Sequence, residues 1–274
     1  MIKVATQDKN IEQTAIYRAK TEEILKEEQK TLELIKNNDP DSALKRLSLA
    51  DSMLNLASNY LVMNGIVQSV LKMKNEEVLN EARKSLYKSV IYLEEIVSSY
   101  IDAPYADYAD KLEAIDNVTP EERYLLVRKM GLAIDLLENA YGDNTKWKWS
   151  FVELEGRYAT VAKNIINLRD IAVNLNMDSE HYESTVRHLM LAKKLLARTA
   201  DRYRQKYELS TNLIDDFKQG VLYLAALRRL SLVTGNQQEA VDTKKKLDVW
   251  NTKLAADIEK QEKEKKEQVD LTKG

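Results

Sequence analysis

The chain has 274 residues, of which only three are Pro and seven are Gly, and it contains no Cys. Strand-rich domains of this length use Gly and Pro repeatedly in tight turns, so the composition favours long helices. The lack of Cys excludes disulfides, thiolate zinc sites and cysteine nucleophiles. With 42 basic and 44 acidic residues the net charge is -2, and we expect no nucleic-acid partner and no general attraction to anionic membranes.

The first residues do not resemble a secretory signal, because Lys3, Asp8 and Lys9 interrupt the apolar positions. An exported or periplasmic mature form would look the same, so a cytoplasmic location is only the default expectation. The segment 52–71 carries no charge, but four amide side chains lie within it. Those amides argue against a transmembrane segment.

Helical periodicity and the few breaks in it predict about nine helices. We expect them at residues 11–37, 40–73, 76–101, 105–116, 120–141, 146–175, 178–207, 210–234 and 236–267. Thr119 precedes Pro120, and Glu122 follows three residues after Thr119, which is the pattern of a capping box. Asp39 before Pro40 resembles a second helix start.

Short connections between these helices predict an all-α array of antiparallel helical hairpins. No linker rich in Pro or Ser divides the chain, so residues 1–258 are expected to form a single helical domain. Residues 259–274 are strongly charged and are expected to be a frayed C-terminal helix extension.

A short pattern of small, large and small residues at positions i, i+4 and i+7 follows several predicted turns. The three instances are Ala43-Leu47-Ala50, Ala82-Leu86-Ser89 and Thr185-Leu189-Ala192, and Ala240 begins a partial fourth. Small residues on one helix stripe allow a neighbouring helix to approach closely. The pattern resembles the second helix of a tetratricopeptide (TPR) repeat, which implies a TPR-like α-solenoid. The spacing does not keep a 34-residue period, so a non-repeating helical bundle remains the alternative.

Enzyme motifs are missing from the sequence. No glycine-rich phosphate loop and no nucleophile elbow occurs. The only two histidines, His181 and His188, lie about 10 Å apart along a helix, which is too far to bind one metal ion. We therefore expect a protein that is not an enzyme, with no catalytic residues, no metal site and no cofactor.

Two surfaces on predicted helices are candidate binding sites. Asn55 and Asn59 lie in the uncharged segment 52–71, where buried amides need partners in neighbouring helices or in a ligand. Lys194, Arg198 and Arg202 form a basic stripe at steps of four residues. This stripe is suited to an acidic partner, although such a stripe is more often a solvated face or pairs with an acidic segment of the same chain, here 94–122.

Aromatic residues give a third candidate. Fourteen of the nineteen aromatic residues are Tyr, whose polar tip suits interfaces. Tyr100, Tyr105 and Tyr108 lie among aspartates, and Trp147 begins another predicted helix beside Trp149. Packing between helices would explain these rings equally well.

Together these features predict a scaffold that binds a protein or peptide partner on a concave helical surface. The alternative is a small-molecule-binding protein similar to the TPR-like subunits that accompany solute transport. The sequence does not identify the partner, the ligand or the oligomeric state. An open aromatic groove would favour the first function, and a cavity would favour the second.

Overall fold

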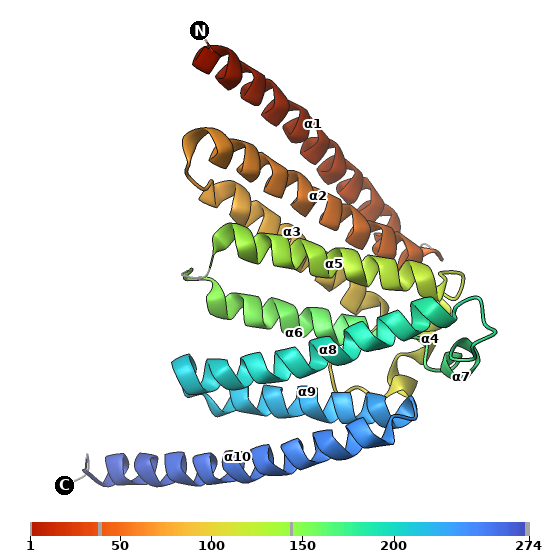
Figure 1. Cartoon of the computed structure of the whole chain (residues 1–274), viewed down its shortest axis with the longest axis vertical. Helices are drawn as coiled ribbons and strands as arrows, with labels where there is room; N and C mark the ends of the chain where they lie inside the picture. The colour runs from red at the N-terminus through yellow and green to blue at the C-terminus, as the bar shows by residue number, and fades with distance from the viewer. Residues whose placement is uncertain (1, 38–39, 143–144, 272–274) are drawn as a thin grey trace. The chain divides into compact units, whose positions relative to one another are not determined.

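The computed structural model describes residues 2–37, 40–142 and 145–271, and the side chains of 14–37, 40–142, 145–264 and 266. These residues contain ten α-helices and no strand, which confirms the all-α prediction (Figure 1). The helices are α1 (Ile2–Lys36), α2 (Ser42–Leu71), α3 (Glu76–Ile96), α4 (Ala109–Glu113), α5 (Pro120–Tyr141), α6 (Lys148–Asn164), α7 (Ile171–Asn174), α8 (Tyr182–Lys206), α9 (Ile214–Val233) and α10 (Gln237–Leu271). A 3-10 turn, η1 (Tyr105–Asp107), precedes α4, and a π-helical turn, η2 (Tyr207–Thr211), follows α8. The expected cap Asp39 lies outside the described residues.

The chain forms two compact units. Unit 1 comprises residues 1–99 and 104–188, and unit 2 comprises residues 100–103 and 189–274. Each unit is described by itself below. The single domain expected over residues 1–258 stays a prediction.

The core of unit 1 is a set of antiparallel helices in which α2 packs against α1, α3 and α5, and α6 packs against α3 and α5. The predicted small residues mark the closest approach, because Ala50, Ala82 and Ser89 are completely buried. The Ser89 hydroxyl donates a hydrogen bond of 2.8 Å to the backbone oxygen of Ala50. Small side chains therefore bring α2 and α3 into contact, as their spacing predicts.

The start of α5 confirms the predicted capping box. The Thr119 hydroxyl accepts a hydrogen bond from the backbone N–H of Glu122, and the Glu122 carboxylate accepts one from the backbone N–H of Thr119. This pair satisfies two donors that the first turn of a helix leaves open. The Glu122 carboxylate accepts hydrogen bonds from both the backbone N–H and the hydroxyl of Thr119, and these bonds favour its ionised form and lower its pKa. The start of α5 is thus fixed in position.

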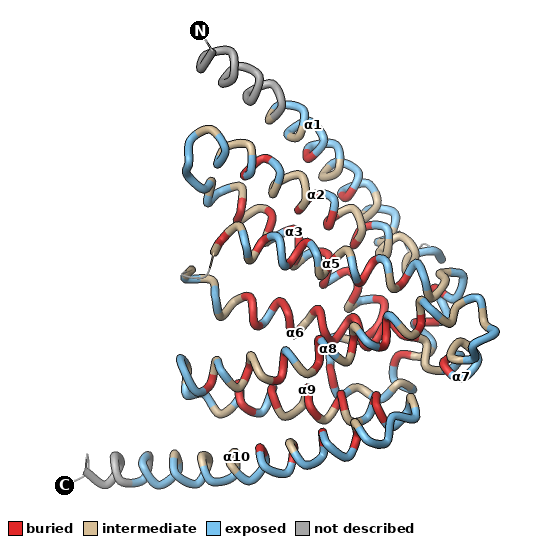
Figure 2. The backbone as a smooth tube through the Cα atoms, in the orientation of Figure 1, coloured by how far each residue is buried: buried red, intermediate tan, exposed pale blue. Residues whose placement is uncertain are grey.

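Unit 2 is built from residues 189–206 of α8 together with α9 and α10. A Cβ at Gly220 would lie 3.0 Å from the backbone oxygen of Ala200 and 3.2 Å from the Trp250 ring. Gly220 therefore permits close helix packing. Figure 2 shows that the buried residues on α10 lie in its first half, and residues 251–264, which follow, are exposed or half-buried.

The largest departure from the predicted helices lies in residues 146–175. A continuous helix was expected there, but α6 ends at Asn164 and the short α7 begins at Ile171. In the connection between α6 and α7, the Asn167 side chain accepts a hydrogen bond of 3.1 Å from the backbone N–H of Arg169. It also donates one of 2.6 Å to the Asp170 carboxylate. Asn and Asp side chains bond nearby backbone and side-chain groups in this way and so compete with the helix. The prediction of an unbroken helix was wrong for this reason.

Candidate functional site

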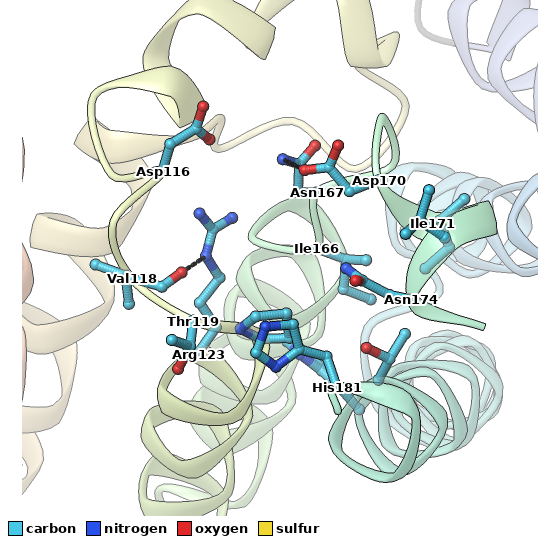
Figure 3. Close-up of a pocket in the computed structure, with 14 residues that line it drawn as sticks. Asp116, Val118, Thr119, Arg123, Ile166, Asn167, Asp170, Ile171, Asn174 and His181 are labelled. Carbon is cyan, nitrogen blue, oxygen red and sulfur yellow. Dashed lines mark hydrogen bonds between the residues drawn. The ribbon is translucent and has the colours of Figure 1, made fainter. Parts of the chain in front are cut away.

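A pocket of about 290 Å³ lies in unit 1, where the start of α5, the connection after α6, α7 and the start of α8 meet (Figure 3). Its buried lining includes Arg123, Thr185 and His188, whereas Asp116 and Asp170 are exposed at its edge. The pocket therefore has a buried cationic group inside and carboxylates at the rim.

Arg123 is held in the pocket wall by backbone oxygens. Its Nε donates to the oxygen of Val118 at 3.0 Å, and its two terminal nitrogens donate to the oxygens of Ile165 and Ile115 at 3.2 and 2.8 Å. Burial lowers the pKa of this guanidinium, and the nearby charges of Asp116 and Asp170 act in the opposite direction. An arginine side chain still carries its charge under these conditions.

A guanidinium has five N–H donors, and three of those of Arg123 are used by backbone oxygens. Within the described part of the chain, no carboxylate forms an ion pair with it. Two donors of this buried cation thus have no partner among the described residues. A buried charge whose donors are not all satisfied is unusual in a folded protein, and it is a mark of a binding site.

The rim carboxylates flank this guanidinium. In Figure 3, Asp116 lies on one side of the Arg123 tip, and Asn167 and Asp170 lie on the other. The Asp170 carboxylate is oriented by the Asn167 amide at 2.6 Å. The Tyr105 hydroxyl donates to the side-chain oxygen of Asn167 at 2.6 Å, so the amide is itself fixed.

His188 is buried in the pocket wall. Its Nε2 lies 2.9 Å from the backbone oxygen of Ala162, and because a carbonyl only accepts, Nε2 carries the proton and Nδ1 is an acceptor. Burial lowers the pKa of His188 to about 4, and the positive charge of Arg123 adds to this effect. The imidazole is therefore neutral at pH 7.

His181 and Thr185 complete the polar lining on α8 and the turn before it. His181 is half-buried, with Nε2 3.4 Å from the Glu180 carboxylate. The Thr185 hydroxyl is buried and has no hydrogen-bond partner among the described residues. A buried hydroxyl without a partner costs stability, so its presence here is a second sign of a site adapted to a ligand.

None of the site residues named from the sequence lines this pocket. Asn55 is exposed and its side chain lies 3.4 Å from the Asp51 carboxylate, and Asn59 is half-buried. Both amides lie on α2, whose later turns are exposed to solvent in part: Val62 and Leu71 are 41% and 57% exposed. The buried amide of α2 is Asn64, whose oxygen accepts the backbone N–H of Asn75 at 2.8 Å.

The three tyrosines belong to different units. Tyr100 is 71% exposed and belongs to unit 2, whereas Tyr105 and Tyr108 pack edge to face in unit 1 with ring centroids 5.6 Å apart. Burial raises the pKa of the Tyr108 hydroxyl, which has no hydrogen-bond partner among the described residues. The Tyr105 hydroxyl supports the pocket through Asn167, although its ring does not line it.

Trp147 and the basic stripe do not line the pocket either. The Arg83 guanidinium lies 4.1 Å from the centroid of the Trp147 ring, a cation–π contact within unit 1. In unit 2, Lys194 and Arg198 are exposed and Arg202 is half-buried. Lys206, the next residue of the stripe, forms an ion pair of 2.7 Å with Asp216.

Sequence reasoning missed the pocket because it treated residues 146–175 as one helix. The signal was a run of Asn and Asp residues, which are poor helix formers and favour turns. The run consists of Asn164, Asn167, Asp170, Asn174 and Asn176. Three of these five, Asn167, Asp170 and Asn174, line the pocket.

No helix in the described part of the chain is long and apolar enough to cross a membrane. The described side chains form no group of three or more His, Asp or Glu residues that could hold a metal ion.

The chain matches a protein-family model. No curated protein and no solved structure matches the chain. The family model that does match is described as the TP0443 family, and it covers residues 6–258. Because this match spans most of the sequence, the chain belongs to the TP0443 family.

Proposed function

We propose that this protein is a non-enzymatic helical protein that binds a small molecule in the Arg123 pocket. The observation that carries this proposal is a buried guanidinium in the wall of a cavity of about 290 Å³, with two donors that no described residue uses. Small-ligand sites combine a concave apolar lining with a few fixed polar groups. Among the two functions expected from the sequence, a cavity favours the small-molecule binder.

The polar side chains of the pocket are held in place by hydrogen bonds to the backbone, which supports binding rather than catalysis. Arg123 is held by three backbone oxygens, and His188 by the oxygen of Ala162. A histidine with a pKa of about 4 is a weak base at neutral pH, where general-base catalysis needs a pKa near the working pH. Rigid donors and acceptors of this kind are suited to recognising a ligand.

The proposal is tested with a variant that fills the pocket from its exposed rim. Val173 lines the pocket and is 69% exposed, so Val173→Trp adds bulk there without disturbing the core. Met177 is 81% exposed on the same segment and does not line the pocket, so Met177→Trp is the matched control. A metabolite library is screened by thermal shift against all three proteins.

We expect at least one compound to raise the melting temperature of the wild type and of Met177→Trp, but not of Val173→Trp. A ligand at ten times its dissociation constant stabilises by about 1.4 kcal/mol, which is measurable as a shift of a few degrees. A compound that stabilises all three proteins equally would place binding elsewhere. A library without any stabilising compound would contradict the proposal.

A scaffold function is a second candidate, and a specific surface favours it. Leu125, Leu132 and Leu136 are spaced by seven and four residues, so they share one face of α5. They are 47%, 61% and 48% exposed. An exposed row of leucines is suited to the apolar face of a partner helix, and the TPR-like reading of the chain is part of this candidate.

For this second function, a partner is first identified by crosslinking in native extract, and its capture by variants of this protein is then measured. Leu132→Asp should abolish the capture of that partner. Val62→Asp, at a position of α2 that is 41% exposed, is the matched control and should retain the partner. Equal capture by both variants would remove the leucine row as the binding surface.

A further inference from the structure

We propose that the ligand of the Arg123 pocket is a small zwitterion, namely an aliphatic α-amino acid. In this arrangement its carboxylate accepts hydrogen bonds from Arg123 and its ammonium group faces Asp116 and Asp170. This inference rests on the function proposed above and narrows it to one class of ligand.

The carboxylate half follows from the unused donors of Arg123. Arg123 is 4% exposed, so the charge of its guanidinium acts in a medium of low polarisability. Ionised acceptors form stronger hydrogen bonds with arginine than neutral ones do. The Thr185 hydroxyl, which is buried in the same lining and has no partner among the described residues, is a further donor toward the ligand.

The ammonium half follows from the charge balance of the lining. Arg123 contributes one positive charge, and Asp116 and Asp170 contribute two negative charges, so the pocket carries -1 with histidines counted as neutral. A ligand with one negative charge would change the net charge of the pocket to -2 and would lie beside two carboxylates. A ligand with one positive charge would lie beside the buried guanidinium, which repels it. A zwitterion leaves the total unchanged and places each of its charges near an opposite one.

The apolar part of the lining favours an aliphatic side chain. Val118, Ile166, Ile171 and Val173 all line the pocket between the polar groups. Its volume of about 290 Å³ is near the lower limit of small-ligand sites, which suits a compound of amino-acid size.

The test compares compounds that differ by one charged group. L-alanine, L-valine, L-isoleucine and L-leucine are titrated by calorimetry, followed by 3-methylbutylamine and 4-methylpentanoate, which are leucine without its carboxylate and without its ammonium group. We expect at least one of the four amino acids to bind, and leucine to bind at least roughly tenfold more tightly than either one-charge analogue. Val173→Trp should remove this binding.

The roles of the two charges are separated by variants. Asp116→Asn combined with Asp170→Asn should lower the preference for leucine over 4-methylpentanoate by roughly five- to tenfold, because both compounds carry the carboxylate and only leucine carries the ammonium group that the rim carboxylates attract. Asp110→Asn removes an exposed charge that does not line the pocket and should leave the preference unchanged. Arg123→Lys should weaken the binding of both compounds. Because Arg123 also donates hydrogen bonds to three backbone oxygens, its replacement can disturb the fold, and the test therefore depends on the rim variants.

The inference is overturned if none of the four amino acids binds, or if 4-methylpentanoate binds the wild type as tightly as leucine does. If the amino acids fail while another compound binds in a manner sensitive to Val173→Trp, the zwitterion inference falls and the proposed pocket function stands. If no compound at all is sensitive to Val173→Trp, the proposed function itself falls.

Discussion

Arg123 and His188 are buried polar residues that meet in the wall of one pocket. Each is fixed by backbone oxygens, Arg123 by those of Ile115, Val118 and Ile165 and His188 by that of Ala162. Buried polar groups normally have partners, and here the partners come from four different positions of the backbone. The residues therefore tie together the ends of α4 and α6 and the start of α5, and two donors of Arg123 have no partner among the described residues.

The burial of His188 predicts a pH dependence of stability. The pKa of about 4 in the folded protein lies below the ordinary value of 6.5, so the unfolded chain takes up the proton first as the pH falls. The free energy of unfolding should decrease by about 1 to 3 kcal/mol between pH 6.5 and pH 4 from this group. Urea unfolding over this range measures it.

His188→Gln, which keeps an N–H donor but does not titrate, should flatten the pH dependence. His181→Gln is the matched control, since His181 is half-buried and is the only other histidine of the chain. An unchanged slope in His188→Gln would contradict the account of this residue.

Two glycines inside helices predict opposite effects of the same substitution. A Cβ at Gly131 of α5 would lie 2.5 Å from the hydroxyl oxygen of Tyr158, which is buried and donates to the Val127 oxygen. At Gly65 of α2 nothing lies within 4 Å. Gly131→Ala should therefore destabilise by about 1 to 2 kcal/mol, and Gly65→Ala should stabilise by about 0.5 to 1 kcal/mol.

The measurement is the urea midpoint of both variants beside that of the wild type. Equal stabilisation by the two alanines would show that the Tyr158 contact does not constrain α5.

At the scale of helices, the sequence predicted the start of α5 correctly and missed the end of α6. The capping box of Thr119 and Glu122 begins α5 as expected, because it depends only on residues a few positions apart. The end of α6 depends on Asn167, whose partners include Tyr105 from a distant part of the chain. Local periodicity carries no information on such a partner, and the pocket that this connection shapes was missed with it.

The cap of α5 gives a prediction at this scale. Thr119→Ala removes the hydroxyl that accepts the Glu122 N–H and should lower the free energy of unfolding by about 1 kcal/mol. Ser69→Ala is the matched control, since this exposed hydroxyl donates to a backbone oxygen inside α2 and caps nothing. Urea unfolding of both variants measures the difference, and an equal effect would contradict the role of the cap.

For the whole molecule, the scarcity of Gly and Pro was sufficient to predict the all-α class, because long helices need few turns. The small residues of α2 and α3 were also interpreted correctly as points of close approach. Site residues were harder to predict, since exposure and burial of Asn55, Tyr108 or Trp147 depend on helices that are distant in sequence. A pocket formed by four chain segments has no local pattern.

The central claim is that the Arg123 pocket binds a small molecule, and the two histidines allow a direct measurement. Both line the pocket and no other histidine exists in the chain, so the imidazole NMR signals report only on this site. On titration with the compound that gives the largest thermal shift, both imidazole signals should move and saturate in the wild type and in Met177→Trp, and should stay fixed in Val173→Trp. Imidazole signals that stay fixed in the wild type while that compound binds would contradict the account.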